Sequence, residues 1–334
     1  MTWLGDDMLA IVFLALMGIA MLMYAVLDGY DLGIGMLIVR QPEKDRDRMI
    51  AAIGPFWDAN ETWLVLGVGV LLVAFPVAHG RVLGALYVPV SLMLAGLILR
   101  GVSFDFRAKA KVQQKRFWDH LFFTGSLLTA LTQGYMLGLY IVGFESGVYA
   151  QVFALTSALC VSAAYMLIGA SWLILKSSGD LQLKSIAWAQ KAVLVTGVGL
   201  ILVSVINPLA SEAIFIKWFT WPQTLLLLPL PMVTAMMLWL LRYHLTHMPY
   251  RDDRLCWLPF CLCLVIFILA FSGLAYSFYP FIVPQQLTVW EAAAAPESLR
   301  VVLLGCAVVL PAILAYTALS YWIFRGKSTD LNYY

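Results

Sequence analysis

Two acidic side chains stand at the head of a long apolar run, a placement that limits how the chain can fold. Residues 54–63 read GPFWDANETW, and the apolar run continues to residue 75. Asp58 and Glu61 are three positions apart, so a helix puts them on one face, with Trp57 four positions before Glu61 on the same side. A carboxylate within a membrane helix must face protein or water, which makes these acids candidates for a proton or ion relay.

The composition is that of a polytopic membrane protein. Hydrophobic residues make up 62% of the 334 residues and charged residues 12%, which is more apolar surface than a water-soluble fold of this length can bury. We therefore expect an all-α integral membrane protein in contact with the lipid bilayer, with a single polytopic domain over residues 1–334. The motifs lie in residues 1–143, residues 144–334 are less distinctive, and no nucleic-acid partner is predicted.

The apolar runs predict about nine transmembrane helices arranged in bundles, since a span needs roughly 20 apolar residues. Of the 21 lysines and arginines, 18 fall in alternate connections and the C-terminal tail, and three fall on the other side. Basic residues collect on the cytoplasmic side, so we predict a periplasmic N-terminus and a cytoplasmic C-terminus. The predicted spans cover residues 8–27, 54–75, 82–100, 118–143, 153–175, 189–207, 223–242, 255–278 and 300–323.

A second pair of acids follows the first predicted span. Residues 27–35 read LDGYDLGIG, with Asp28 and Asp31 again three positions apart among three glycines. Two interpretations stay open. Either the helix ends at the cytoplasmic interface and both acids are solvated, or it continues to about Val39 and holds the acids against a base such as Arg100.

Arg100 closes the third predicted span within residues 99–107, which read LRGVSFDFR. Arg100 and Asp105 are flanked by apolar and aromatic residues, and a charge that is desolvated without a partner is costly. Both are therefore candidates for internal ion pairs. The basic run from Arg107 to Arg116 is interpreted instead as a solvated determinant of topology.

The four histidines all fall at predicted span ends or in connections. A chain that holds its own b-type haem would offer axial ligands from span interiors. The methionines and the five cysteines are interpreted as packing residues, and no metal site is predicted. Any redox cofactor is therefore expected to be ligated by another chain.

Four motifs taken together resemble subunit II of the cytochrome bd family of quinol oxidases, including its shorter, cyanide-insensitive branch. They are residues 27–35, residues 54–63, residues 100–107, and Trp118-Asp119 followed by Gly125-Ser126. These motifs cover the first four predicted spans, and their order makes the set far more specific than any one of them. Spans five to nine match in hydropathy and number alone.

The resemblance implies a heterodimer in the bacterial inner membrane. Subunit I would carry two b-type haems, one d-type haem and the quinol site, while this chain would ligate no cofactor and hold no catalytic residue. The complex would oxidise quinol and reduce dioxygen to water, separating charge across the membrane without pumping protons. The resemblance leaves open whether a structural quinone and a small single-span accessory subunit also bind.

Within this chain, the resemblance also implies roles for particular residues. It places Trp57 and Asp58 on a proton entry route at the subunit boundary and Trp63 beside a hydrophobic path for oxygen. Glu61 joins the proton route because it shares a helical face with Asp58. We predict that the route supplies protons from the cytoplasm.

The residues alone leave two other functions open. A proton-coupled membrane transporter would use Asp28, Asp31, Asp58 and Glu61 as coupling sites around glycine-broken helices. An inert scaffold would use the acids only to pair with Arg100. A substrate-sized midplane cavity confined to this chain would favour the transporter, whereas haem bands in the purified complex would favour the oxidase.

Overall fold

The computed structural model describes residues 5–328, most of which are helical. An α-helix satisfies its own backbone hydrogen bonds, which an apolar layer requires. The described part contains nine long helices and several short elements. The long helices are α1 (Asp6–Leu37), α3 (Trp57–Ala74), α4 (Pro76–Lys109), α5 (Val112–Ile141), α6 (Val148–Lys176), α7 (Asp180–Ala210), α10 (Pro229–His247), α11 (Leu258–Phe278) and α13 (Pro296–Ile323). The short ones are α2 (Glu43–Ile53), α8 (Glu212–Phe219), α9 (Gln223–Leu227), the 3-10 helix η1 (Arg251–Asp253), β1 (Phe281–Val283), β2 (Leu287–Thr288) and α12 (Val289–Ala292).

Eight of the long helices in the described part are long and apolar enough to cross a membrane. The remaining long helix, α5, carries charged side chains between Lys115 and Asp119 and packs between α4 and α6. The prediction of an all-α integral membrane protein is therefore confirmed. The orientation of the chain across the membrane stays a prediction.

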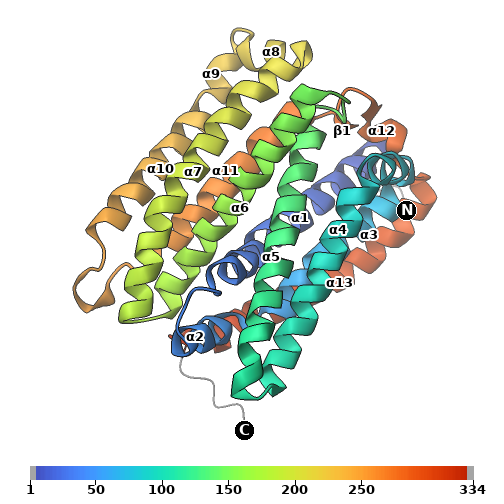
Figure 1. Cartoon of the computed structure of the whole chain (residues 1–334). Coiled ribbons are helices and arrows are strands. Elements are labelled where there is room, and N and C mark those ends of the chain that lie inside the picture. Colours follow the sequence, from blue (N-terminus) through green and yellow to red (C-terminus); the bar gives the residue numbers. More distant parts are fainter. Residues whose placement is uncertain (1–4, 329–334) are drawn as a thin grey trace.

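The long helices form two neighbouring groups (Figure 1). Helices α1, α3, α4 and α5 make one group, helices α7, α10 and α11 lie in the other, and α6 joins them by packing against α1, α5, α7 and α11. Helix α1 contacts α3, α5 and α6, so its second half is enclosed on several sides. This enclosure positions Asp28 and Asp31 inside the protein.

Glycines allow α1 and α6 to approach closely. A Cβ atom at Gly33 would overlap the backbone oxygen of Tyr165, and a Cβ atom at Gly169 would lie 2.8 Å from the nitrogen of Ile34. Small residues at a helix interface permit this kind of backbone contact. The spacing between α1 and α6 is thus set by residues that carry no side chain.

Several helices extend beyond their predicted spans. Helix α1 continues to Leu37 rather than ending at residue 27, and α4 covers Pro76–Lys109 rather than residues 82–100. The predicted spans ended where apolar residues gave way to charges. The helices continue because partners inside the protein satisfy those charges.

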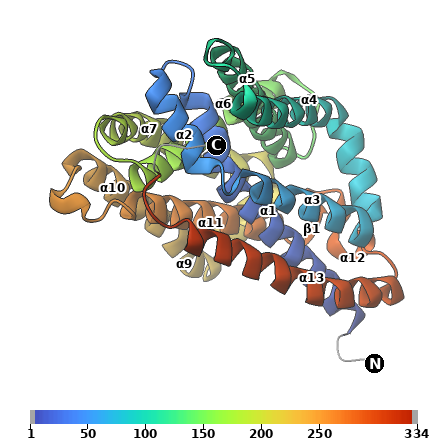
Figure 2. The same cartoon turned by 90° about the horizontal axis from the view of Figure 1, so that it is seen from below.

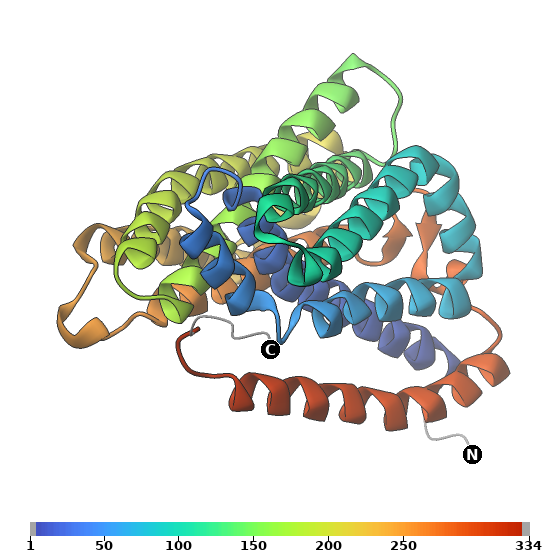
Figure 3. The same cartoon turned by 60° about the horizontal axis from the view of Figure 1, so that its bottom comes forward.

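Helix α13 lies along the outside of the first group (Figures 2 and 3). It buries three side chains in the described structure. Polar contacts hold both of its ends: Arg300 pairs with Asp6 at 2.6 Å, and the hydroxyls of Tyr321 and Tyr30 are 2.7 Å apart. The last helix is therefore attached near its ends rather than along its length.

The segment after α13, residues 324–328, is fastened to the end of α6, and we call it the C-terminal latch. The buried Lys176 ammonium donates to the carbonyl oxygens of Phe324 and Gly326. Ser328 donates its backbone N–H and its hydroxyl to the Lys176 carbonyl, at 2.7 and 2.9 Å. Since a buried ammonium is costly without acceptors, the latch satisfies Lys176 as well as tethering α13.

Candidate functional site

The centre of the site is a charged triad, Asp28, Glu61 and Arg100, contributed by α1, α3 and α4. The Arg100 guanidinium lies 2.6 Å from an Asp28 carboxylate oxygen and also pairs with Glu61. The side chains of Arg100 and Asp28 are 1% and 0% exposed, whereas that of Glu61 is 28% exposed. The triad therefore starts at the surface of this chain with Glu61 and ends inside it with Asp28.

Asp31 lies one turn further along α1 and is also buried. The Asn60 amide donates to the Asp31 carboxylate at 2.9 Å and to the Tyr30 hydroxyl at 2.8 Å. The Tyr321 hydroxyl donates to the Asn60 side-chain oxygen at 3.2 Å. Helix α1 thus continues through Asp28 and Asp31, as the second interpretation predicted, and each of these two acids has a polar partner on another helix.

Asp58 lies in the first turn of α3 and is exposed. It forms no ion pair with any base that the structure describes, because Arg100 reaches Glu61 and Asp28 instead. The partly buried Trp57 next to it packs on α4, with 4.8 Å between the ring centroids of Trp57 and Phe104. An unpaired carboxylate therefore stands at the surface one turn before the triad.

Trp63 lies inside the protein, on the opposite side of α3 from solvent. Its side chain is 1% exposed and belongs to the main apolar core. Among the described residues, its indole N–H has no hydrogen-bond acceptor. The surroundings of Trp63 are accordingly apolar.

The end of α4 differs from its predicted arrangement. Asp105 is exposed and the structure brings it to no base among the described residues, so the expected ion pair within this chain is not observed. The interpretation of Arg107 as a solvated residue is wrong, because Arg107 is 4% exposed. The two residues are two positions apart on a helix, so burying Arg107 turns Asp105 outward.

Arg107 belongs to a second charged cluster that joins α2, α4 and α5. Its guanidinium lies 2.5 Å from Asp119 and 2.9 Å from Asp47. Arg46 of α2 reaches the other oxygen of Asp119 at 2.8 Å. Each buried charge in this cluster is matched by an opposite one, which is the condition for charge inside a protein.

The four histidines lie on helices α4, α5 and α10. His79 and His120 lie near the starts of α4 and α5, and His120 is exposed. His244 and His247 lie in the last turn of α10, where the Nδ1 atom of His244 is 2.8 Å from the Tyr250 hydroxyl. The described residues contain no group of three or more metal-ligating side chains. The absence of haem from this chain stays a prediction.

Sequence reasoning missed several residues of these polar groups, among them Asn60, Asp119 and Tyr321. Asn60 lies inside the motif at residues 54–63, where its position between two acids was the available signal. Asp119 lies in a quoted motif, but its partners Arg46 and Arg107 lie on α2 and α4, and Arg107 was interpreted as solvated. Tyr321 had no local signal, because its partners Tyr30 and Asn60 are distant in the sequence.

Known proteins resemble this chain over nearly its whole length. The family described as cytochrome bd terminal oxidase subunit II matches residues 9–324. Cytochrome bd-I ubiquinol oxidase subunit 2 of Escherichia coli strain K12 is 28% identical over 370 aligned positions, which cover 97% of this chain and 96% of the relative. Cytochrome bd ubiquinol oxidase subunit 2 of Bacillus subtilis strain 168 is 27% identical over 320 positions, which cover 90% and 91%. A chain of the solved bd oxidase from Geobacillus thermodenitrificans shares the fold, with a TM-score of 0.77 at 15% identity over 95% of this chain and 98% of that one.

Proposed function

The chain belongs to the cytochrome bd terminal oxidase subunit II family, and from this premise we propose that its Asp58 face passes protons toward an oxygen-reducing partner subunit. The chain is a multi-pass component of a quinol oxidase complex in the bacterial cell membrane. A proton-coupled transporter finds no support among the relatives. Reduction of one dioxygen to two waters consumes four protons, so such a complex needs a path that delivers them.

The position of Asp58 supports this proposal most directly. It is exposed on this chain, it is not neutralised by a described base, and it precedes a charged triad by one helical turn. A carboxylate can accept a proton from water and release it again, which an amide cannot do. Trp57 supports this position by packing its ring against Phe104, which fixes the start of α3 relative to α4.

The triad gives Glu61 and Arg100 a different role from that of Asp58. Arg100 is shared between Asp28 and Glu61, so it holds the acid-bearing parts of α1 and α3 at a fixed distance. Glu61 lies between the exposed Asp58 and the buried guanidinium. We place Asp58 and Glu61 on the proton path, with Arg100 and Asp28 positioning them.

The proposed partner, subunit I, would contribute the electron-transfer part of the reaction. Subunit I is the proposed holder of the two b-type haems, the d-type haem and the quinol site, and these haems supply the electron transfer to oxygen. The apolar surroundings of the buried Trp63 support its proposed place beside an oxygen path. In this scheme protons come from the cytoplasm, so turnover separates charge across the membrane without a pump.

The test compares Asp58→Asn with Asp105→Asn in the complete oxidase complex. Both acids are exposed and neither has an ion-pair partner among the described residues, so the second variant is matched in charge and exposure. We expect Asp58→Asn to lower quinol-driven oxygen uptake at least tenfold while haem content and subunit recovery stay normal. Asp58→Glu should restore part of the activity, and Asp105→Asn should keep most of it.

Each other result argues against the proposal. Full assembly with wild-type oxygen uptake in Asp58→Asn would exclude a proton-carrying role for Asp58. Loss of haem and of the partner subunit would instead assign Asp58 to assembly. An equal loss of activity in Asp105→Asn would mean that surface charge in general, rather than this carboxylate, controls turnover.

A further inference from the structure

We infer that the connection between α10 and α11 binds an anionic phospholipid through its phosphate group. The connection comprises residues 248–257 and includes η1 (Arg251–Asp253). Leu255 has a φ angle of 63°, in the left-handed region that residues other than glycine seldom occupy. This backbone holds Leu255 outward on the surface, where it is 38% exposed.

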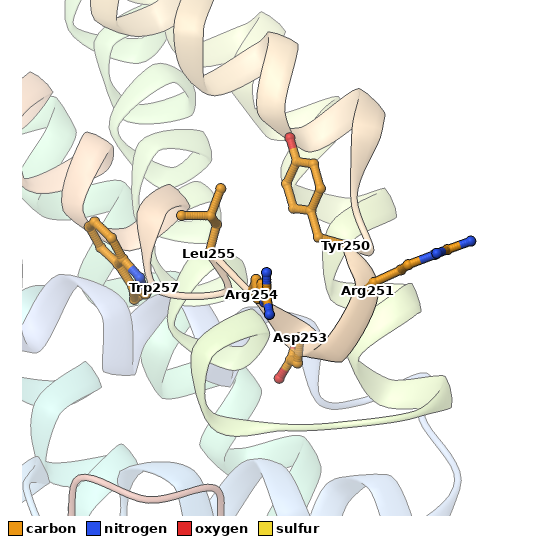
Figure 4. Close-up of a pocket in the computed structure, with 6 residues that line it drawn as sticks. All are labelled: Tyr250, Arg251, Asp253, Arg254, Leu255 and Trp257. Carbon is orange, nitrogen blue, oxygen red and sulfur yellow. The ribbon is translucent and has the colours of Figure 1, made fainter.

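An open depression with a volume of about 780 Å³ lies on this connection. In Figure 4, Trp257 stands at one end and Arg251 at the other, with Arg254 between them. Trp257 is 49% exposed, so its indole, like Leu255, is uncovered in this chain. The depression therefore combines a basic part with an apolar part. Its lining residues are Tyr250, Arg251, Asp253, Arg254, Leu255 and Trp257.

The two arginines are available for an anion. Arg251 and Arg254 are exposed, and neither side chain forms an ion pair or hydrogen bond with another described residue. Asp253 is already engaged, because it accepts from Gln182 at 2.7 Å and pairs with Lys327 of the C-terminal latch. Asp252, exposed and without a described partner, is the remaining acid of η1, so two unpaired guanidinium groups face one unpaired carboxylate.

The position of the connection brings it to the lipid headgroups. Helix α10 runs along the edge of the molecule (Figure 1). Its last turns expose Trp239 and Tyr243 by 63% and 47%, with their ring centroids 5.7 Å apart. Aromatic rings of this kind favour the membrane interface. The arginines of the connection follow directly, at the depth where lipid phosphates lie.

The chemistry of the depression selects an anionic amphiphile. A guanidinium donates two parallel hydrogen bonds to phosphate oxygens, and basic pockets between membrane helices bind anionic headgroups. Leu255 and Trp257 offer apolar surface to the glycerol and acyl part of the same molecule. Inorganic phosphate would leave this apolar surface uncovered, and a zwitterionic lipid brings a positive charge that the arginines repel.

The experiment uses the whole oxidase complex in nanodiscs of phosphatidylcholine that contain a photoactivatable phosphatidylglycerol. Adducts are mapped by mass spectrometry to the peptide that contains residues 248–257, and unlabelled phosphatidylglycerol is added as competitor. The variant is Arg251→Gln with Arg254→Gln. The matched control is Lys109→Gln with Arg116→Gln, which removes two exposed basic charges outside the depression.

We expect the wild-type adduct to be competed by phosphatidylglycerol but not by phosphatidylcholine of equal chain length or by inorganic phosphate at millimolar concentration. A basic side chain near an anionic lipid surface contributes roughly a fivefold factor in binding, so the double variant should bind about 25-fold more weakly. The control variant should stay within about twofold of wild type. The haem spectrum checks that each complex has assembled.

Four results would overturn the inference. They are equal competition by the two lipids, displacement by inorganic phosphate, an equal loss in the control variant, and unchanged labelling in the double variant. The wild-type competition alone can exclude the site, even if a variant fails to assemble. If the double variant loses a co-purifying small subunit while lipid labelling is unchanged, the depression is a protein contact and the lipid assignment is wrong.

Discussion

Helix α1 and helix α13 are of similar length, 32 and 28 residues, yet the protein holds them in opposite ways. Helix α1 is enclosed by α3, α5 and α6 and carries Asp28 and Asp31 inside. Helix α13 leaves most of its surface uncovered in this chain and is attached by polar contacts near its ends. The difference indicates that α1 positions charge through close packing, whereas α13 presents its surface to lipid or to a partner.

Removing Arg100 should produce the largest effect, because Arg100 pairs with Asp28 on the enclosed helix α1. Arg100→Gln leaves the Asp28 carboxylate buried without its ion-pair partner, a change that costs about 3 to 5 kcal/mol. We expect most of the complex to be lost, measured as haem content and recovery of both subunits after detergent extraction. Arg40→Gln, at an exposed arginine without an ion-pair partner among the described residues, is the control and should assemble normally.

A second variant separates charge from shape in the same region. Asp28→Asn combined with Arg100→Gln removes both charges and should recover part of the complex that Arg100→Gln loses. Normal assembly of Arg100→Gln alone would show that the triad does not hold α1 in place. In that case only apolar packing, and not the ion pairs of Arg100, would distinguish how α1 and α13 are held.

Adding one methyl group to each helix should change the stability of the complex by an intermediate amount, with opposite signs for α1 and α13. Gly33→Ala places a Cβ atom against the Tyr165 backbone, and such overpacking costs about 1 to 3 kcal/mol. Gly305→Ala on α13 meets no atom within 4 Å, and alanine favours a helix over glycine by up to about 1 kcal/mol. The melting temperature of the complex should fall for Gly33→Ala and stay level or rise for Gly305→Ala. An equal change in melting temperature for the two variants would mean that α1 is no more tightly packed than α13.

The smallest effect is expected from the polar attachment of α13. Tyr321→Phe removes the hydroxyl that contacts Tyr30 and Asn60, which costs about 1 kcal/mol for a typical hydrogen bond. Hydrogen exchange should become faster in residues 296–323 while α1 stays protected. Tyr316→Phe is the matched control, since Tyr316 is 60% exposed on the same helix. Faster exchange in α1 as well would mean that the two helices open together.

The fold followed from the sequence because hydropathy reports directly on helices that cross an apolar layer. The ends of the helices followed only in part: the continuation of α1 was one of two open interpretations, because Asp28 and Arg100 stay buried through ion pairs that join α1, α3 and α4. A single stretch of sequence shows the cost of a buried charge but not the distant partner that offsets it. For the same reason, Arg107 was interpreted as solvated although Asp119 and Asp47 enclose it.

The geometry of the candidate site residues was predicted in part, and their roles stay predictions. The spacing of Asp58 and Glu61 indicated a shared face, and the structure places both near the same end of α3. Spacing could not show that Arg100 would reach Glu61 and leave Asp58 without a base, because this depends on the packing of α4 against α3. Asp105 illustrates the same limit, since a helical turn decides whether an acid faces inward.

The C-terminal latch has a consequence for the synthesis of the protein. Residues 324–328 leave the ribosome after every helix, and Lys176 waits in α6 for the carbonyl oxygens of Phe324 and Gly326. A chain interrupted before residue 324 would insert its helices yet leave a buried ammonium without these acceptors and its last helix untethered. The latch can therefore form only after the last described helix, α13, has been synthesised.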